Sequence, residues 1–155
     1  MAQGSASKPR ILVVGTVDAV QTARLIIGDS FDYRCAFSLE QARTGLDPDV
    51  ALVVCSMRFD DAGMIDFLEL VHADEHGARL PVVCFHPYSR EVSRSAREAL
   101  AAVLESFAYA RFVDLYATAR AHGVSAAAAE LREAAFAALG SEIAASPDGE
   151  AACMA

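Results

Sequence analysis

The chain has 155 residues, a length that suits one domain able to bury a hydrophobic core of its own. Hydrophobic residues make up 54% of it, too many for a disordered chain, yet no run approaches the ~20 consecutive apolar residues that cross a membrane. We therefore expect no membrane location. The net charge is -8 and Lys and Arg form no cluster, so we expect no nucleic-acid partner.

Both ends of the chain have the composition of tails. Residues 1–9 are small and polar and hold no apolar segment typical of a signal peptide, so we expect a flexible tail and a cytoplasmic protein. Residues 141–155 are small and acidic, which is typical of a disordered tail. Residues 10–140 are expected to form the folded domain.

The first half of this domain alternates strands with helices. The central apolar run, Val50 to Val54, is unbroken and rich in β-branched residues, as in a strand buried on both faces of a parallel sheet. Short strands joined to helices by short loops predict an α/β fold with a parallel sheet covered on both faces. The predicted strands are residues 11–14, 33–37, 50–54 and 80–85, and the predicted helices are about residues 20–27, 38–45 and 64–71.

The second half is more ambiguous. The segment from Tyr88 to His122 contains neither Gly nor Pro, and its apolar spacing predicts two consecutive helices. A fifth strand at Ala110 to Leu115 is the competing interpretation. Ser125 to Leu139 is rich in Ala and predicts a further helix, which Gly140 would close.

The order of these elements resembles the receiver domain of bacterial two-component response regulators. The resemblance is carried by Pro-Asp-Val-Ala-Leu-Val-Val-Cys-Ser-Met at residues 48–57, by Gly63 and by Leu-Pro-Val-Val at residues 80–83, and it covers residues 10–87 best. It implies a flavodoxin-like, doubly wound sheet with strand order 2-1-3-4-5, in which the fifth strand lies at an edge. If residues 88–122 are helical, the order becomes 2-1-3-4 with extra C-terminal helices.

The resemblance also shows what this sequence lacks. Receiver domains take a phosphoryl group from a histidine kinase onto an aspartate, which requires an acceptor carboxylate, an acidic pair that holds Mg²⁺, a hydroxyl and a Lys. The acceptor position falls on Cys55, eight residues before Gly63. The acidic pair falls on Gly15 and Thr16.

The remaining two groups are missing as well. The hydroxyl position falls on His86, or on Phe85 if the register slips by one, and the single Lys of the chain is Lys8 in the tail. We therefore predict a pseudo-receiver, a non-enzymatic module without metal or cofactor that binds a signalling partner independently of phosphorylation. Asp18, Asp60 and Asp61 belong to loops near this site, where capping or solvated carboxylates are more common than a shifted Mg²⁺ site.

The alternative hypothesis is a thiol-based redox sensor or a small enzyme. Cys55 would lie near a helix N-terminus, which lowers the pKa of a thiol, and His86 could lie close to it on the neighbouring strand. In the competing structural role, Cys55 simply ends a buried strand. The accessibility of the thiol distinguishes the two roles.

A candidate partner surface lies in the second half of the chain. Its residues are Arg90, Arg94 and Arg97, which share one side of the helix expected after the fourth strand, and the aromatic residues Phe107, Phe112 and Tyr116. If the fourth strand is a sheet edge, these aromatic side chains must cover it within the chain or across a homodimer. We therefore expect a homodimer through this face.

Overall fold

The computed structural model describes residues 8–57, 63–87 and 110–145, together with residues 94–95, 98–99, 102 and 105. Five parallel strands form one sheet in the order β2-β1-β3-β4-β5. The flavodoxin-like α/β fold predicted from the sequence is confirmed. The strands are β1 (Arg10–Val14), β2 (Asp32–Ala36), β3 (Val50–Ser56), β4 (Val82–His86) and β5 (Ala110–Asp114).

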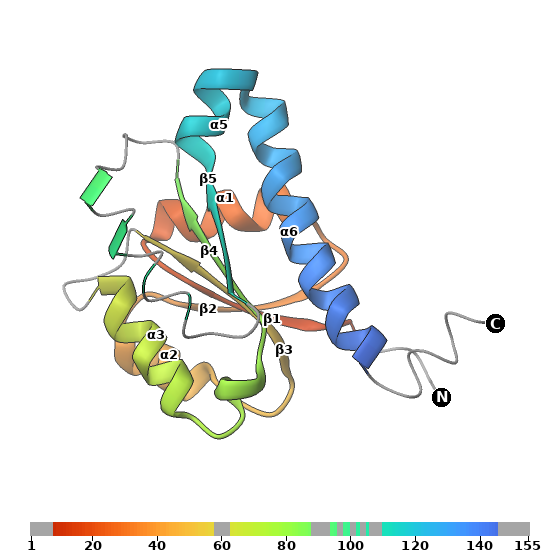
Figure 1. The fold of residues 1–155 in the computed structure, drawn as a ribbon. Helices are drawn as coiled ribbons and strands as arrows, with labels where there is room; N and C mark the ends of the chain where they lie inside the picture. The colour runs from red at the N-terminus through yellow and green to blue at the C-terminus, as the bar shows by residue number, and fades with distance from the viewer. Residues whose placement is uncertain are drawn as a thin grey trace.

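Helices cover both faces of this sheet. Figure 1 shows α1 and α6 on one face and α2 and α3 on the other. None of the helices in the described part of the chain combines the length and the apolar character needed to cross a membrane. The helices are α1 (Val17–Ile27), α2 (Leu39–Gly45), α3 (Gly63–Ala73), the short 3-10 helix η1 (Gly77–Arg79), α5 (Leu115–His122) and α6 (Val124–Ala145).

The fifth strand corrects the prediction of two consecutive helices between Tyr88 and His122. β5 pairs in parallel with β4 along its whole length, from Val82 opposite Ala110 to His86 opposite Asp114. Phe112 and Val113 pack against opposite faces of the sheet, as neighbouring residues of a buried strand do. The order 2-1-3-4 is therefore extended to 2-1-3-4-5, and β4 is not a sheet edge.

Capping side chains and a terminal glycine determine where the first two helices begin and where α1 ends. The hydroxyl of Ser38 accepts a hydrogen bond from the N–H of Gln41 (3.1 Å), as the predicted capping pattern requires. Thr16 accepts one from the N–H of Ala19 (3.4 Å), so α1 begins three residues before the predicted start at Val20. Gly28 ends α1 as expected, with a φ of 102° that favours glycine.

The end of the domain differs from the prediction. α6 continues through Gly140 to Ala145, so residues 141–145 are helical and do not begin a disordered tail. A glycine within a helix costs only about 1 kcal/mol, and helix-forming residues on both sides of Gly140 outweigh that cost. Residues 1–7 and 146–155 of the predicted tails lie outside the described part.

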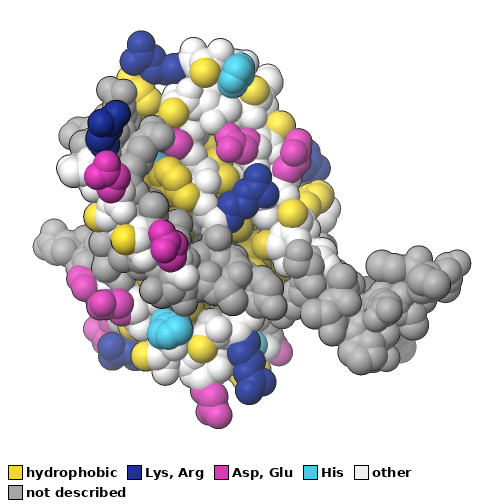
Figure 2. All heavy atoms as spheres, viewed as in Figure 1, with side chains coloured by type: hydrophobic (Ala, Val, Ile, Leu, Met, Phe, Trp, Pro, Cys, Tyr) yellow, Lys and Arg dark blue, Asp and Glu magenta, His cyan; other side chains and the backbone are white. Residues whose placement is uncertain are grey.

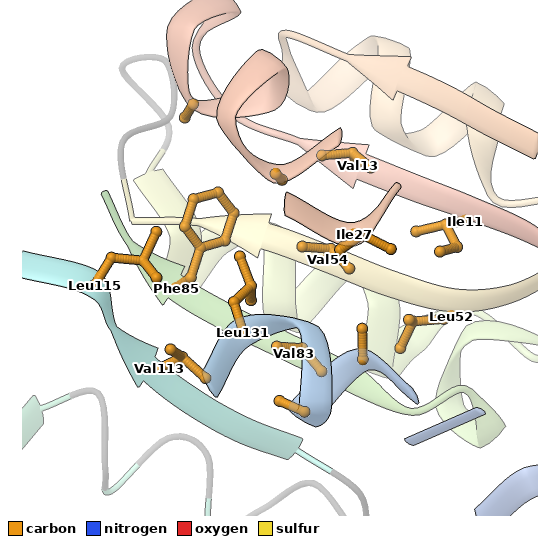
Figure 3. Close-up of a cluster of buried hydrophobic side chains, with 14 of the residues drawn as sticks. Ile11, Val13, Ile27, Leu52, Val54, Val83, Phe85, Val113, Leu115 and Leu131 are labelled. Atoms are coloured by element: carbon orange, nitrogen blue, oxygen red, sulfur yellow. The ribbon is translucent and has the colours of Figure 1, made fainter. Parts of the chain in front are cut away.

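The sheet separates two hydrophobic cores. Alternate residues of β3 serve both, because Val53 faces the core beneath α2 and α3 and Val54 faces the core beneath α1 and α6. Both side chains are completely buried, as predicted for a central parallel strand. Figure 3 shows the second core, in which Leu131 of α6 lies beside Val83 and Phe85 of β4.

The long helix α6, and not α5, covers the sheet after β5. α6 contacts α1, β3, β4 and β5, whereas α5 packs mainly against α6. The hydroxyl of Thr118 in α5 donates to Oε1 of Glu130 in α6 (2.6 Å). In Figure 1, α5 and the first turns of α6 form a helical hairpin at the carboxyl end of β5.

Candidate functional site

The residues that correspond to a phosphorylation pocket share one edge of the sheet. Gly15 and Thr16 follow β1, Cys55 lies near the end of β3, and His86 ends β4. The strand register places Val14 opposite Cys55 in the parallel ladder, so the end of β1 adjoins that thiol. Ligands of open parallel sheets bind at this carboxyl edge.

Cys55 is completely buried in this fold. Burial raises the pKa of the Cys55 thiol well above its ordinary value, and the neighbouring Cys84 raises it further. The thiol donates to the carbonyl of Ser56 at 3.5 Å. Burial outweighs any effect of the helix N-terminus that follows β3, so a nucleophilic thiolate is not formed at neutral pH. This burial opposes the thiol-sensor hypothesis for Cys55 and His86.

Cys84 shares this environment, since it lies opposite Cys55 in the ladder between β3 and β4. Burial raises the pKa of Cys84 from 9.0 to about 12. Between these two values, the unfolded chain loses a proton that the folded chain keeps. The stability present below pH 9 is therefore lost as the pH rises toward 12.

We expect the free energy of unfolding to fall by about 1.4 kcal/mol per pH unit for each such thiol in this window. Denaturant unfolding at about pH 8 and about pH 10.5 measures the fall. Cys84→Ala removes one of the two thiols and should make the fall shallower. An equal fall in the parent and the variant would contradict the assignment of Cys84 as a buried, protonated thiol.

Gly15 and Thr16 offer no carboxylate for Mg²⁺. Gly15 is buried and donates its N–H to the carbonyl of Ala36 (3.1 Å), and the Thr16 hydroxyl caps α1. Within the described ranges, no three His, Cys, Asp or Glu side chains are grouped closely enough to hold a metal ion. Mg²⁺ prefers carboxylate oxygens, so these residues do not fit the ion on which phosphoryl transfer in receiver domains depends. Asp60 and Asp61 lie outside the described part.

The single lysine is at the wrong end of the sheet. Lys8 precedes β1 and therefore lies toward its amino end, away from Cys55. Its ammonium group donates to the carbonyl of Asp29 at 3.2 Å, next to the start of β2. No lysine can therefore approach a phosphoryl group at the carboxyl edge.

β5 adds an acidic residue that the sequence analysis did not single out. Asp114 lies opposite His86 in the parallel ladder, and both are more than nine-tenths buried. Its Oδ1 accepts a hydrogen bond from the N–H of Ala117 (3.0 Å) and so caps α5. An Asp before a helical pattern is a common helix-start signal, but only the pairing of β5 with β4 places Asp114 beside His86.

Three residues of the predicted partner surface lie in the described part of the chain. Phe112 is half-buried against the core beneath α2 and α3. Tyr116 is half-buried in α5, with the guanidinium of Arg120 5.8 Å from its ring centroid. Arg94 is exposed. Arg90, Arg97 and Phe107 lie outside the described residues.

No protein-family model matches the sequence, and no curated protein matches it. Solved structures do match. A response regulator receiver protein from Pseudomonas putida is 18% identical, with a TM-score of 0.54, and the match covers 70% of this chain and 87% of that chain. The response regulator domain of Thermotoga maritima CheB is 16% identical, with a TM-score of 0.58 and coverage of 84% and 95%.

The phosphorylated cyanobacterial phytochrome response regulator RcpA gives a similar result. It is 11% identical, with a TM-score of 0.61, and the match covers 83% of this chain and 91% of that chain. Together with the strand order and the helices on both faces of the sheet, these likenesses identify the architecture. The chain has the fold of response regulator receiver domains.

Proposed function

We propose that this protein is a pseudo-receiver, a cytoplasmic module of bacterial two-component signalling that binds a partner protein and is neither phosphorylated nor an enzyme. The observation that carries the proposal is the buried thiol of Cys55 at the acceptor position, which the raised pKa keeps protonated. A protonated thiol is a poor nucleophile toward a phosphoryl group. At the positions where the resemblance expects an acidic pair and a Lys to neutralise charge, this sequence has neither.

A receiver fold without this chemistry retains its surfaces. Buried hydrophobic side chains form a core on each face, and the parallel sheet runs from β2 to β5. The fold therefore remains able to present side chains to another protein although its pocket has changed. The similar structures are proteins of two-component signalling, which supports the same role for this chain.

A homodimer through Phe107, Phe112 and Tyr116 stays a prediction of the sequence. This prediction assumes that β4 is an exposed edge of the sheet. In the structure, β5 pairs with β4 at that edge. Phe112 and Tyr116 are half-buried, so little of either ring is available to a second copy. Sedimentation at micromolar concentration tests the dimer, and Tyr116→Glu should dissociate it if it forms.

Restoring the acceptor carboxylate alone should not restore phosphorylation. In Cys55→Asp, acetyl phosphate with Mg²⁺ should leave the intact mass unchanged, because no acidic pair holds the ion and no Lys is nearby. The variant should also lose several kcal/mol of stability, since a buried charge without a cation is costly.

Cys55→Ser is the matched control, because it keeps the size and neutrality of the side chain. Its smaller loss of stability separates the effect of charge from that of the lost thiol. Mass spectrometry of both variants, with circular dichroism to follow folding, gives the result. A phosphoryl group on the introduced carboxylate would show that the rest of the pocket still works, and would contradict the proposal.

A further inference from the structure

A hollow of about 680 Å³ lies at the amino end of the sheet, where α1 ends and β2 begins. We call it the cationic hollow. Its wall includes charged, apolar and aromatic side chains, namely Lys8, Arg24, Leu25, Asp29, Phe31 and Tyr33. Because Cys55 lies near the carboxyl end of β3, the hollow is separate from the altered phosphorylation pocket.

Aromatic rings form part of the wall of the hollow. The Tyr33 hydroxyl donates to the carbonyl of Gly28 at 2.5 Å, which fixes the ring, and the Arg24 guanidinium lies 5.2 Å from the ring centroid. Phe31 packs edge-on against Phe136 of α6 with centroids 5.5 Å apart. These contacts position the rings before any partner binds.

The aromatic surface continues from the hollow onto α6. There the guanidinium of Arg132 lies 5.4 Å from the ring centroid of Phe136, and Phe136 itself remains 42% exposed. Leu25 is 84% exposed on the wall of the hollow. Tyr and Arg, which lie beside these exposed apolar side chains, are enriched among the residues that dominate binding energy at protein interfaces.

The cations of this region form no ion pair with a carboxylate of the described residues, although Asp29 lies on the same wall. Elsewhere in the described ranges, Arg34 pairs with Asp47 at 2.6 Å, and Arg10 lies within 4 Å of Asp47 and Asp49. Lys8, Arg24 and Arg132 form no such ion pair among the described residues. On the face seen in Figure 2, acidic and cationic side chains are interspersed. On a chain of net charge -8, three unpaired cations beside an apolar surface favour a ligand with negative charge.

We propose that the cationic hollow binds an acidic, amphipathic segment of a partner protein. An apolar side chain of the segment packs against Leu25 and Phe31, and its carboxylates pair with Lys8, Arg24 and Arg132. The hollow is broad and open, so it suits a protruding side chain better than a small molecule that must be enclosed. This inference rests on the proposed function of partner binding and names the surface and the chemistry of the partner.

Two peptides of equal length test it, one with Leu and Phe between Glu residues and one with Lys in place of every Glu. Each is titrated into the ¹⁵N-labelled full chain, and amide shifts are followed by NMR. We expect the acidic peptide to shift amides at the end of α1 and the start of β2 and the basic peptide to shift none. Binding should weaken about tenfold or more between ~0.1 M and ~1 M salt, because the cations are exposed.

Single substitutions separate the electrostatic part of the interaction from the apolar part. Arg24→Glu should weaken binding of the acidic peptide about tenfold or more, because it replaces attraction with repulsion. Leu25→Ala should weaken it several-fold by removing the apolar contact. Arg43→Glu is the matched control, since it makes the same charge change on exposed α2 across the sheet and should leave binding unchanged.

Several results would overturn the inference. They are equal binding of the two peptides, no binding of the acidic one, or an equal effect of Arg24→Glu and Arg43→Glu. Self-association in sedimentation that Arg24→Glu abolishes would make a second copy the occupant, and binding seen only in a chain ending at Ala145 would make residues 146–155 the occupant. None of these results depends on phosphorylation, so the proposed function can stand if the inference fails.

Discussion

Val53→Asp is expected to lower the free energy of unfolding by more than about 4 kcal/mol, enough to unfold a domain of ordinary stability. Val53 is completely buried in β3, between Leu12 of β1 and Val82 of β4 in the sheet. Its side chain faces the core beneath α2 and α3, where a carboxylate would meet apolar atoms. Denaturant unfolding followed by circular dichroism measures the loss.

Val17→Asp is the matched control. Val17 is 55% exposed in the first turn of α1, where a negative charge interacts favourably with the helix dipole. The same substitution there should change stability by no more than about 0.5 kcal/mol. A Val53→Asp protein that melts within about two degrees of the parent would show that β3 is not the central buried strand.

Leu131→Ala is expected to cost about 2–5 kcal/mol, because it leaves a cavity in a packed core. Leu131 is completely buried on α6 and lies beside Val83 and Phe85 of β4 (Figure 3). The loss would establish that α6 covers this face of the sheet. Thermal and denaturant unfolding give the change.

Leu25→Ala removes the same atoms from a side chain that is 84% exposed on α1. It should change stability by no more than about 0.5 kcal/mol, since little apolar surface is lost from the core. An equal effect of the two substitutions would contradict the packing of α6 against the sheet.

Much of the fold could be predicted because its signals are local. The unbroken apolar run of β3 and the pair Ser38 and Gln41 each specify a structure within a few residues. β5 could not be predicted in this way. Its apolar residues Phe112 and Val113 are flanked by charge, and their spacing also suits a helix. Only pairing with β4, distant in sequence, decides between the two.

The residues of the candidate sites also differ in whether the sequence alone could place them. Gly15, Thr16, Cys55 and His86 could be placed at one edge because parallel strands end together. Asp114 could not, since its place beside His86 depends on β5. The cationic hollow has no sequence signature, because Lys8, the end of α1, the start of β2 and α6 meet only in the folded chain.

The intact mass of the unmodified protein after incubation with acetyl phosphate and Mg²⁺ tests the central claim most directly. A receiver domain that carries the acceptor aspartate is treated in parallel to show that the donor is active. The buried thiol of Cys55, the missing acidic pair and the distant Lys8 predict an unchanged mass. A stable increment of one phosphoryl group, mapped to any Asp of this chain, would show that it is a working receiver.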